Sequence, residues 1–262
     1  MADFSTSALT IRGCRIRLMR GGAGEPLLYL HGASGASWLP CLQTLSERFD
    51  VIAPEHPGFG ESDTPDWLDT IHDLAYFYLD FIDELKLRGV HLVGNSLGGW
   101  IAAELAIRST ARLASLTLAG SAGLFVDGVE QLDTFLLNDE QRLRAFFCDQ
   151  KRAEAMIARV LSPEAEDAAL RNRATVAKLG WQPRSHDPHL GKWLHRIDVP
   201  TLLIWGDHDR VFPKAHALAF ENAIPGAKLV MVPNCGHVPQ IEQPDAFVAA
   251  LESFIGTRRQ AA

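Results

Sequence analysis

The segment from Gly94 to Gly98 (Gly-Asn-Ser-Leu-Gly) places a serine where nucleophilic chemistry is favoured. It lies between an expected strand and an expected helix, the context in which a Gly-x-Ser-x-Gly pattern forms a sharp turn that carries a nucleophile. Both glycines lack side chains that would collide where strand and helix approach, so the Ser96 hydroxyl should stand free at the carboxyl end of the strand. The backbone N–H of Leu97 is then placed to stabilise an oxyanion.

A serine hydroxyl is a weak nucleophile at neutral pH and needs a base. In this motif the partners follow the serine in the order acid, then histidine. His237 fits that order, because it lies in a loop after an expected strand near the C-terminus. Asp207 and Asp209 both follow the expected strand at 199–205, and from the residues alone either one is suited to orient the imidazole.

A second loop, His31-Gly32-Ala33-Ser34-Gly35, ends an earlier expected strand. Its small residues allow the backbone to approach a ligand closely, so the N–H of Ala33, or else that of Ser34, is a candidate second oxyanion donor. Seven residues near these loops or in the later helical segment are candidate substrate contacts: His31, Gly32, Ser34, Asn95, Trp100, Trp181 and Val238.

Expected strands and helices alternate along the chain around these residues. Short apolar runs predict strands at 27–30, 50–54, 90–94, 113–119, 199–205 and 227–232. Helical periodicity predicts helices at 38–48, 70–87, 98–108, 213–223 and 244–255. Such alternation predicts an α/β fold with a mostly parallel central sheet and helices on both faces.

The alternation is interrupted between residues 125 and 190. Helices are predicted there at 128–137, 139–147, 150–161 and 163–179, with a break at Ser162-Pro163. We therefore expect a core domain made of residues 1–124 and 191–262, with an inserted helical cap at 125–190. The expected role of its large apolar residues is packing within the cap, and its arginines are expected on a solvated face. These residues are Phe125, Phe135, Phe146, Phe147, Met156 and Trp181, with Arg171, Arg173 and Arg184.

The composition of the chain disfavours several classes of ligand and partner. The chain has 262 residues and a net charge of −7, which disfavours nucleic acid as a ligand. The sequence holds no apolar run of about 18 residues, so no membrane span is expected. Its first residues lack a charged segment followed by an apolar one, so a secretory signal is not expected either. Four cysteines without a C-x-x-C pair predict reduced thiols and a cytoplasmic location. No metal or other cofactor is expected, since His186, His189 and the Asp207–Asp209 segment lack partners at a ligand spacing.

Taken together, the ordered motifs resemble those of the α/β-hydrolase superfamily. They are His31-Gly32, the turn from Pro57 to Ser62, Gly94–Gly98, Gly206-x-x-Asp209-x-x-x-Pro213 and Gly236-His237. The resemblance implies an α/β-hydrolase fold with a helical cap, and it implies Asp209 as the acid. It also implies acyl transfer to Ser96, with His237 as the base and water as the final acceptor.

Three functions remain open at this point. The first, and the one that we expect, is hydrolysis of a carboxylic ester of a small or medium-sized substrate through an acyl-enzyme on Ser96. The alternative is carbon–carbon bond hydrolysis of vinylogous diketo acids, because Asn95-Ser96 and Cys235-Gly236-His237 resemble that subfamily. Val238 after the histidine and Pro40 beyond the first loop depart from its pattern. The third is a small-molecule-binding protein without catalysis. The oligomeric state is left open.

Overall fold

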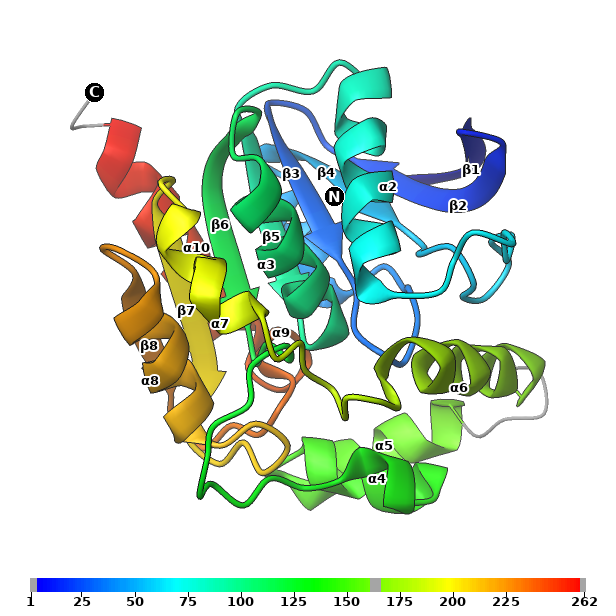
Figure 1. Cartoon of the computed structure of the whole chain (residues 1–262), viewed down its shortest axis with the longest axis vertical. Coiled ribbons are helices and arrows are strands. Elements are labelled where there is room, and N and C mark those ends of the chain that lie inside the picture. Colours follow the sequence, from blue (N-terminus) through cyan, green and yellow to red (C-terminus); the bar gives the residue numbers. More distant parts are fainter. Residues whose placement is uncertain (1–3, 161–165, 260–262) are drawn as a thin grey trace.

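An eight-stranded sheet runs through the centre of the protein, in the order β1-β2-β4-β3-β5-β6-β7-β8 (Figure 1). The computed structural model describes residues 4–160 and 166–259. The strands are β1 Phe4–Ile11, β2 Cys14–Gly21, β3 Glu25–Leu30, β4 Phe49–Pro54, β5 Val90–Asn95, β6 Leu113–Ala119, β7 Thr201–Gly206 and β8 Lys228–Val232. Neighbours from β4 through β8 pair in parallel, which confirms the predicted mostly parallel sheet.

The first two strands form an antiparallel hairpin that was not predicted. Arg12 and Gly13 join them, with φ angles of 48° and 79°. Positive φ at both turn residues is the geometry of a tight two-residue hairpin turn. The overlooked signal was the alternation in β2, where Cys14, Ile16 and Leu18 are buried and the intervening arginines are not.

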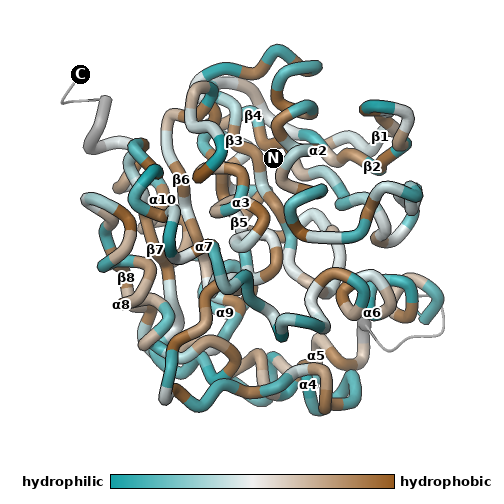
Figure 2. Tube along the Cα trace, in the orientation of Figure 1, coloured by the Kyte–Doolittle hydropathy of each residue, from teal (hydrophilic) through white to brown (hydrophobic). Residues whose placement is uncertain are grey.

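Helices cover both faces of the sheet and enclose two hydrophobic cores. On one face lie α2 Ile71–Glu84, α3 Leu97–Arg108 and α8 Lys214–Ala223. On the other lie α1 Pro40–Leu45, α9 Pro239–Glu242 and α10 Pro244–Arg259. Figure 2 shows hydrophobic residues concentrated along the central strands and α3.

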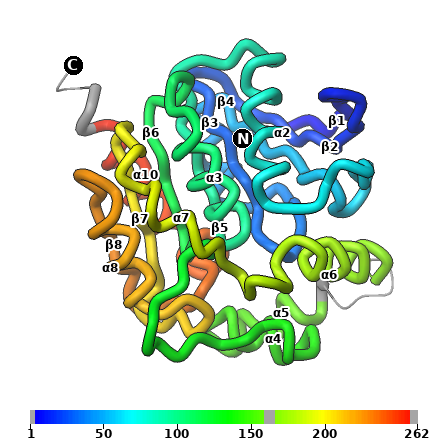
Figure 3. The backbone as a smooth tube through the Cα atoms, in the orientation of Figure 1, coloured from blue at the N-terminus to red at the C-terminus, as the bar shows by residue number. Residues whose placement is uncertain are grey.

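Between β6 and β7, the described residues include the inserted helices α4 Asp139–Phe146, α5 Gln150–Val160 and α6 Glu166–Gly180. These inserted helices lie beyond the carboxyl ends of the parallel strands (Figure 3). The helix predicted at 128–137 is wrong, because the segment holds only a single 3₁₀ turn at Thr134–Leu136. Gly128 has a φ of 72° and the Asp133 side chain accepts from the Phe135 N–H, so local turns replace a helix. The predicted break at Ser162-Pro163 lies outside the described residues.

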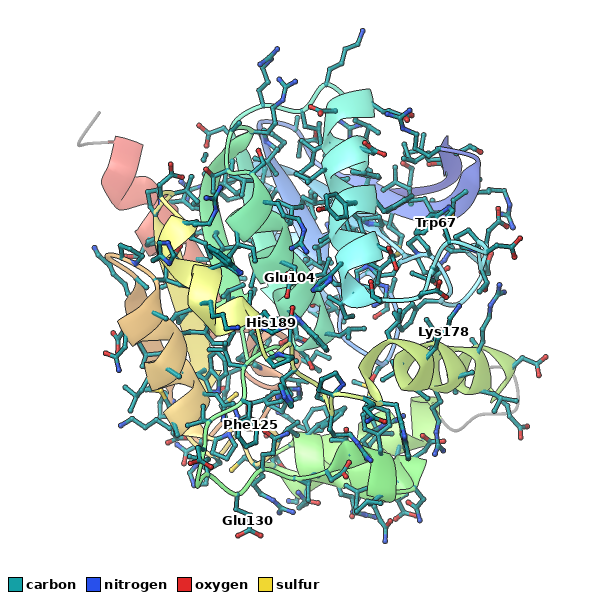
Figure 4. The ribbon with its side chains drawn as sticks, in the orientation of Figure 1. Trp67, Glu104, Phe125, Glu130, Lys178 and His189 are labelled. Carbon is teal, nitrogen blue, oxygen red and sulfur yellow. The ribbon has the colours of Figure 1, made fainter. Side chains whose placement is uncertain are left out.

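The chain leaves and re-enters the core at one place. The Gly123 N–H donates to the Ser185 carbonyl and the Asp187 N–H donates to the Gly123 carbonyl, both at 3.1 Å. A short helix, α7 Leu190–Trp193, and a 3₁₀ turn at Leu194–Arg196 then lead into β7. In Figure 4, Phe125 and Glu130 mark the outgoing segment and Lys178 marks α6. In the described parts of the chain, no helix is long and apolar enough to cross a membrane.

Candidate active site

Ser96 occupies the sharp turn between β5 and α3, with a φ of 52° and a ψ of −113°. A positive φ is uncommon for a residue with a side chain, and it persists only where the surroundings hold it. The Ser96 N–H donates to the Ala119 carbonyl at 2.9 Å, while its own carbonyl accepts from the Trp100 and Ala122 N–H groups at 3.1 Å. A Cβ on Gly98 would lie 2.1 Å from the Leu30 carbonyl oxygen, so only glycine fits there.

A continuous hydrogen-bonded chain links Ser96, His237 and Asp209. Ser96 Oγ lies 2.9 Å from His237 Nε2, and His237 Nδ1 lies 2.9 Å from Asp209 Oδ2. The side chains of His237 and Asp209 are 1% and 0% exposed. Because the carboxylate can only accept, Nδ1 carries the proton and Nε2 is left to accept the serine proton. This arrangement suits a serine for nucleophilic attack.

Asp209 and Asp207, which the sequence did not separate, have different surroundings. The second oxygen of Asp209, Oδ1, accepts from the Val211 and Phe212 N–H groups at 2.9 and 3.0 Å. Asp207 instead pairs with His208 at 2.6 Å on the outside of the same loop. Asp209 is therefore the carboxylate placed to orient the imidazole.

The loop that carries His237 is held by the inserted helices as well as by the core. The His237 N–H donates to the carbonyl of Phe146, the last residue of α4, at 2.7 Å. Buried Glu242 accepts from the Gly236 N–H and from the Asp149 N–H, each at 2.6 Å. One carboxylate thus ties the histidine loop to the start of α5.

Behind the first glycine loop lies a buried chain of His31, His56 and Tyr78. The His56 N–H donates to His31 Nε2 at 3.0 Å, so His31 carries its proton on Nδ1, which donates to the Gly32 carbonyl at 2.7 Å. His56 Nε2 donates to the His31 carbonyl at 2.9 Å, and the Tyr78 hydroxyl donates to His56 Nδ1 at 2.5 Å. Burial lowers the pKa of His31 to about 4 and that of His56 well below its usual value. Both imidazoles are therefore neutral and fix the backbone of the loop.

Two cavities meet at Ser96. The larger, of about 430 Å³, is bordered by five of the candidate substrate contacts: His31, Gly32, Ser34, Asn95 and Val238. Among the described residues, no Asp, Glu, Lys or Arg lines it. The smaller, of about 190 Å³, is bordered by the other two, Trp100 and Trp181, and by Leu97. Ala33, Ser96, Phe146 and His237 line both cavities, so the reacting groups lie between them.

Several residues of the inserted segment border these cavities, and all of them except Trp181 were expected only in a packing or surface role. Phe146, Phe147 and Met156 line the larger cavity, and Phe135, Phe146, Trp181 and Arg173 line the smaller. By contrast, Phe125 is 62% exposed. Arg184 pairs with Asp133 at 2.8 Å, and Arg171 donates to the Gly60 carbonyl at 3.0 Å.

Asn172 and Arg142 were missed altogether. Asn172 on α6 donates to the Ser34 carbonyl at 3.2 Å and accepts from the Gly60 N–H at 2.9 Å, so it fastens α6 to the first glycine loop. It also lines the larger cavity, and Arg142 on α4 lines the smaller. No sequence signal separated either residue from the other polar residues of the insertion.

One group of potential metal ligands lies away from the two cavities. Atoms of His72, Glu104 and Asp187 come within 4.8 Å of one another. Glu104, labelled on α3 in Figure 4, is already paired with Arg108 and accepts from Trp100 Nε1 at 3.3 Å. His72 Nε2 lies 2.7 Å from Asp187 Oδ2. These contacts tie α2 and α3 to the segment that re-enters the core.

Comparison with known proteins finds one matching family model and several similar hydrolases. Residues 27–250 match the model of the alpha/beta hydrolase family. The chain is 30% identical to the 2-hydroxy-6-oxo-6-(2'-aminophenyl)hexa-2,4-dienoic acid hydrolase of Metapseudomonas resinovorans, over 94% of this chain and 89% of that one. It is also 30% identical to the 2-hydroxymuconate semialdehyde hydrolase of Pseudomonas sp. strain CF600, over 95% and 93%. A solved structure described as a membrane phospholipase A superposes with a TM-score of 0.84 at 28% identity, covering 98% of this chain and 87% of the other.

Proposed function

Because the chain belongs to the alpha/beta hydrolase family, we propose that it hydrolyses a bond next to a carbonyl carbon, with Ser96 as the nucleophile. The observation that carries the proposal is the hydrogen-bonded chain from Ser96 Oγ through His237 to Asp209 at the junction of two cavities. The favoured substrate is a small vinylogous diketo acid cleaved at a carbon–carbon bond. The relatives named as dienoic acid and semialdehyde hydrolases support this class.

The mechanism follows from the roles that the contacts permit. His237 Nε2 accepts the Ser96 proton as Oγ attacks the carbonyl carbon, and Asp209 stabilises the imidazolium. The N–H groups of Leu97 and Ala33 bind the oxyanion. The imidazolium then returns the proton to the departing carbon, and a water molecule activated by His237 releases the acid from Ser96. We assign the inserted segment at 125–190 the role of a cap over these steps.

Ester hydrolysis is the second candidate. It is supported by the larger cavity, whose lining in the described part of the chain carries no Asp, Glu, Lys or Arg and suits an uncharged acyl or alcohol group. Val238, which lines this cavity next to His237, is apolar and adds no polar contact for an acid. The solved phospholipase A at 28% identity supports the same reading. Both candidates use the same three residues.

The two candidates are separated by parallel assays on the purified protein. The loss of dienoate absorbance of 2-hydroxy-6-oxo-6-phenylhexa-2,4-dienoate, the compound named for another relative, measures carbon–carbon cleavage. A series of p-nitrophenyl esters from acetate to decanoate measures ester cleavage. The first candidate predicts a kcat/KM for the dienoate far above that of any ester, and Ser96→Ala should abolish both. Faster ester cleavage would select the second candidate.

A binding protein without catalysis would bind a ligand in the same cavities and turn over neither class of substrate. The proposal further includes a small-molecule substrate and a reducing, cytoplasmic setting. The four cysteines are free, and Cys14, Cys41 and Cys235 are buried. Burial raises the pKa of Cys41 to about 12, so this thiol stays protonated and unreactive.

A further inference from the structure

The smaller cavity differs from the larger in carrying two guanidinium groups. Arg142 on α4 and Arg173 on α6 both line it, together with Ser96 and His237. The two arginines share one carboxylate: Arg142 NH2 lies 2.7 Å from Asp139 Oδ1, and Arg173 NH1 lies 3.2 Å from Asp139 Oδ2. Two cations on one anion leave the cluster with a net positive charge of one.

Arg142 is more buried than such a group normally is. Its side chain is only 16% exposed, and its Nε is buried without a hydrogen-bond partner among the described residues. An unsatisfied buried donor is costly, and a charged donor more so, unless a ligand supplies the acceptor. Burial also lowers the pKa of Arg142, with Asp139 opposing this and Arg173 adding to it. A bound anion would therefore stabilise Arg142 and Arg173, because it would offset their excess positive charge and could accept a hydrogen bond from Arg142.

A third arginine near the smaller cavity, Arg184, is neutralised by an ion pair. Arg184 pairs with Asp133, and its guanidinium lies 4.1 Å above the Trp181 ring and 5.0 Å above the Phe135 ring. Trp181 and Phe135 line the smaller cavity, so this ion pair stiffens the aromatic wall without changing the charge. The uncompensated charge belongs to Arg142 and Arg173.

We propose that the smaller cavity is an anion subsite in which Arg142 and Arg173 bind a carboxylate of the substrate. The inference rests on the proposed function, since it assumes that the carbonyl to be attacked sits at Ser96. The part of the substrate that carries the carboxylate then enters the smaller cavity, and the uncharged part on the other side of the carbonyl enters the larger. A guanidinium suits this task because its planar fork matches a carboxylate and remains charged.

Binding of a matched acid and amide tests the subsite without requiring turnover. Isothermal titration of the whole protein with 3-phenylpropanoate and with 3-phenylpropanamide compares two ligands of nearly equal shape. We expect the acid to bind at least tenfold more tightly to the unaltered protein. Arg142→Gln and Arg173→Gln should each reduce that preference severalfold, and the double variant should bring it close to one. Arg144→Gln, on the same helix but paired with Glu140 at the surface, is the matched control and should keep it.

Equal affinity for acid and amide in the unaltered protein would overturn the inference. A preference that persists in both Arg173→Gln and the double variant would overturn it as well. Arg173 is 43% exposed, so its substitution tests the subsite even if that of buried Arg142 impairs folding. If the acid preference depends on these arginines while neither diketo acids nor esters are turned over, the subsite stands and the proposed function fails. If substrate is turned over but the acid is not preferred to the amide, the proposed function stands and the subsite fails.

Discussion

The loops that carry the hydrogen-bonded chain and the inserted helices above them are built in different ways. Asp209 and His237 are almost fully buried, and each is fixed by backbone N–H or carbonyl groups. The inserted helices have polar outer faces, and α4 and α6 bring charged residues to the smaller cavity. In the proposed function the core loops carry the reacting groups, whereas the inserted helices line the two cavities that the substrate would occupy.

Substitutions within the hydrogen-bonded chain should have the largest effect on activity. Ser96→Ala removes the nucleophile and His237→Ala removes the base, so each should lower kcat/KM by about 10⁴-fold or more. The better of the two substrate classes, assayed under single-turnover conditions, measures this. Circular dichroism of each variant checks that the fold is retained. A loss of less than about tenfold in both variants would place the chemistry elsewhere.

Alanine substitutions at two glycines should show that the core is packed more tightly than the inserted helices. In Gly98→Ala the new Cβ would lie 2.1 Å from the Leu30 carbonyl oxygen, and backbone cannot move aside, so the free energy of unfolding should fall by about 3 kcal/mol. At Gly180, at the end of α6, the nearest atom is Phe135 Cζ at 3.7 Å, an ordinary contact. Gly180→Ala should change stability by less than about 1 kcal/mol. Urea unfolding of the pair measures the difference, and equal losses would contradict the contrast.

The buried imidazoles of the core should make stability depend on pH. The folded protein keeps His31 neutral, with a pKa of about 4, whereas an unfolded histidine titrates near 6.5. As pH falls from about 6.5 to about 4, the unfolded chain binds a proton that the folded chain refuses. The free energy of unfolding should therefore fall by about 3 kcal/mol from His31, with His56 acting in the same direction.

Urea unfolding at intervals between pH 7.5 and pH 4.5 measures this loss. In a His31→Asn variant the pH dependence should become shallower, although the variant is less stable at pH 7. An unchanged slope in that variant would mean that the loop does not hold His31 in its neutral form.

A surface ion pair of the inserted helices should have the smallest effect. Lys178 on α6 lies 2.9 Å from Asp69, and the two side chains are 45% and 69% exposed. Exposed pairs contribute little because water screens them, so Lys178→Ala should change the free energy of unfolding by less than about 1 kcal/mol. Activity should stay unchanged. A larger loss in thermal unfolding would show that the insertion depends on surface contacts more than its packing indicates.

The two regions also differ in how far the sequence predicted them. The parallel strands and the sharp turn at Ser96 follow from short-range patterns of apolar residues and glycines, which local sterics convert into structure. The hairpin of β1 and β2 was missed because β1 is an exposed edge strand whose residues show no clear alternation. The failed helix at 128–137 shows that a helical period is overruled by a glycine with positive φ and an Asp that caps a turn.

Within the candidate site too, the residues of the core loops could be predicted from the sequence and those of the inserted helices could not. The candidate residues of the core loops border the cavities because motif order fixes their places along the sheet edge. The distinction between Asp207 and Asp209 needed either a family resemblance or the observed contact with His237. Arg142, Arg173 and Asn172 acquire their positions from the packing of α4 and α6 onto the core. No local pattern in the sequence encodes those long-range contacts.

Covalent labelling shows whether Ser96 is a nucleophile activated by His237. The purified protein is incubated with a fluorophosphonate, and intact-mass spectrometry with peptide mapping follows the adduct. We expect one adduct per chain, located on Ser96, absent in Ser96→Ala and formed far more slowly in His237→Ala. An unlabelled protein, or labelling that persists in Ser96→Ala, would contradict it.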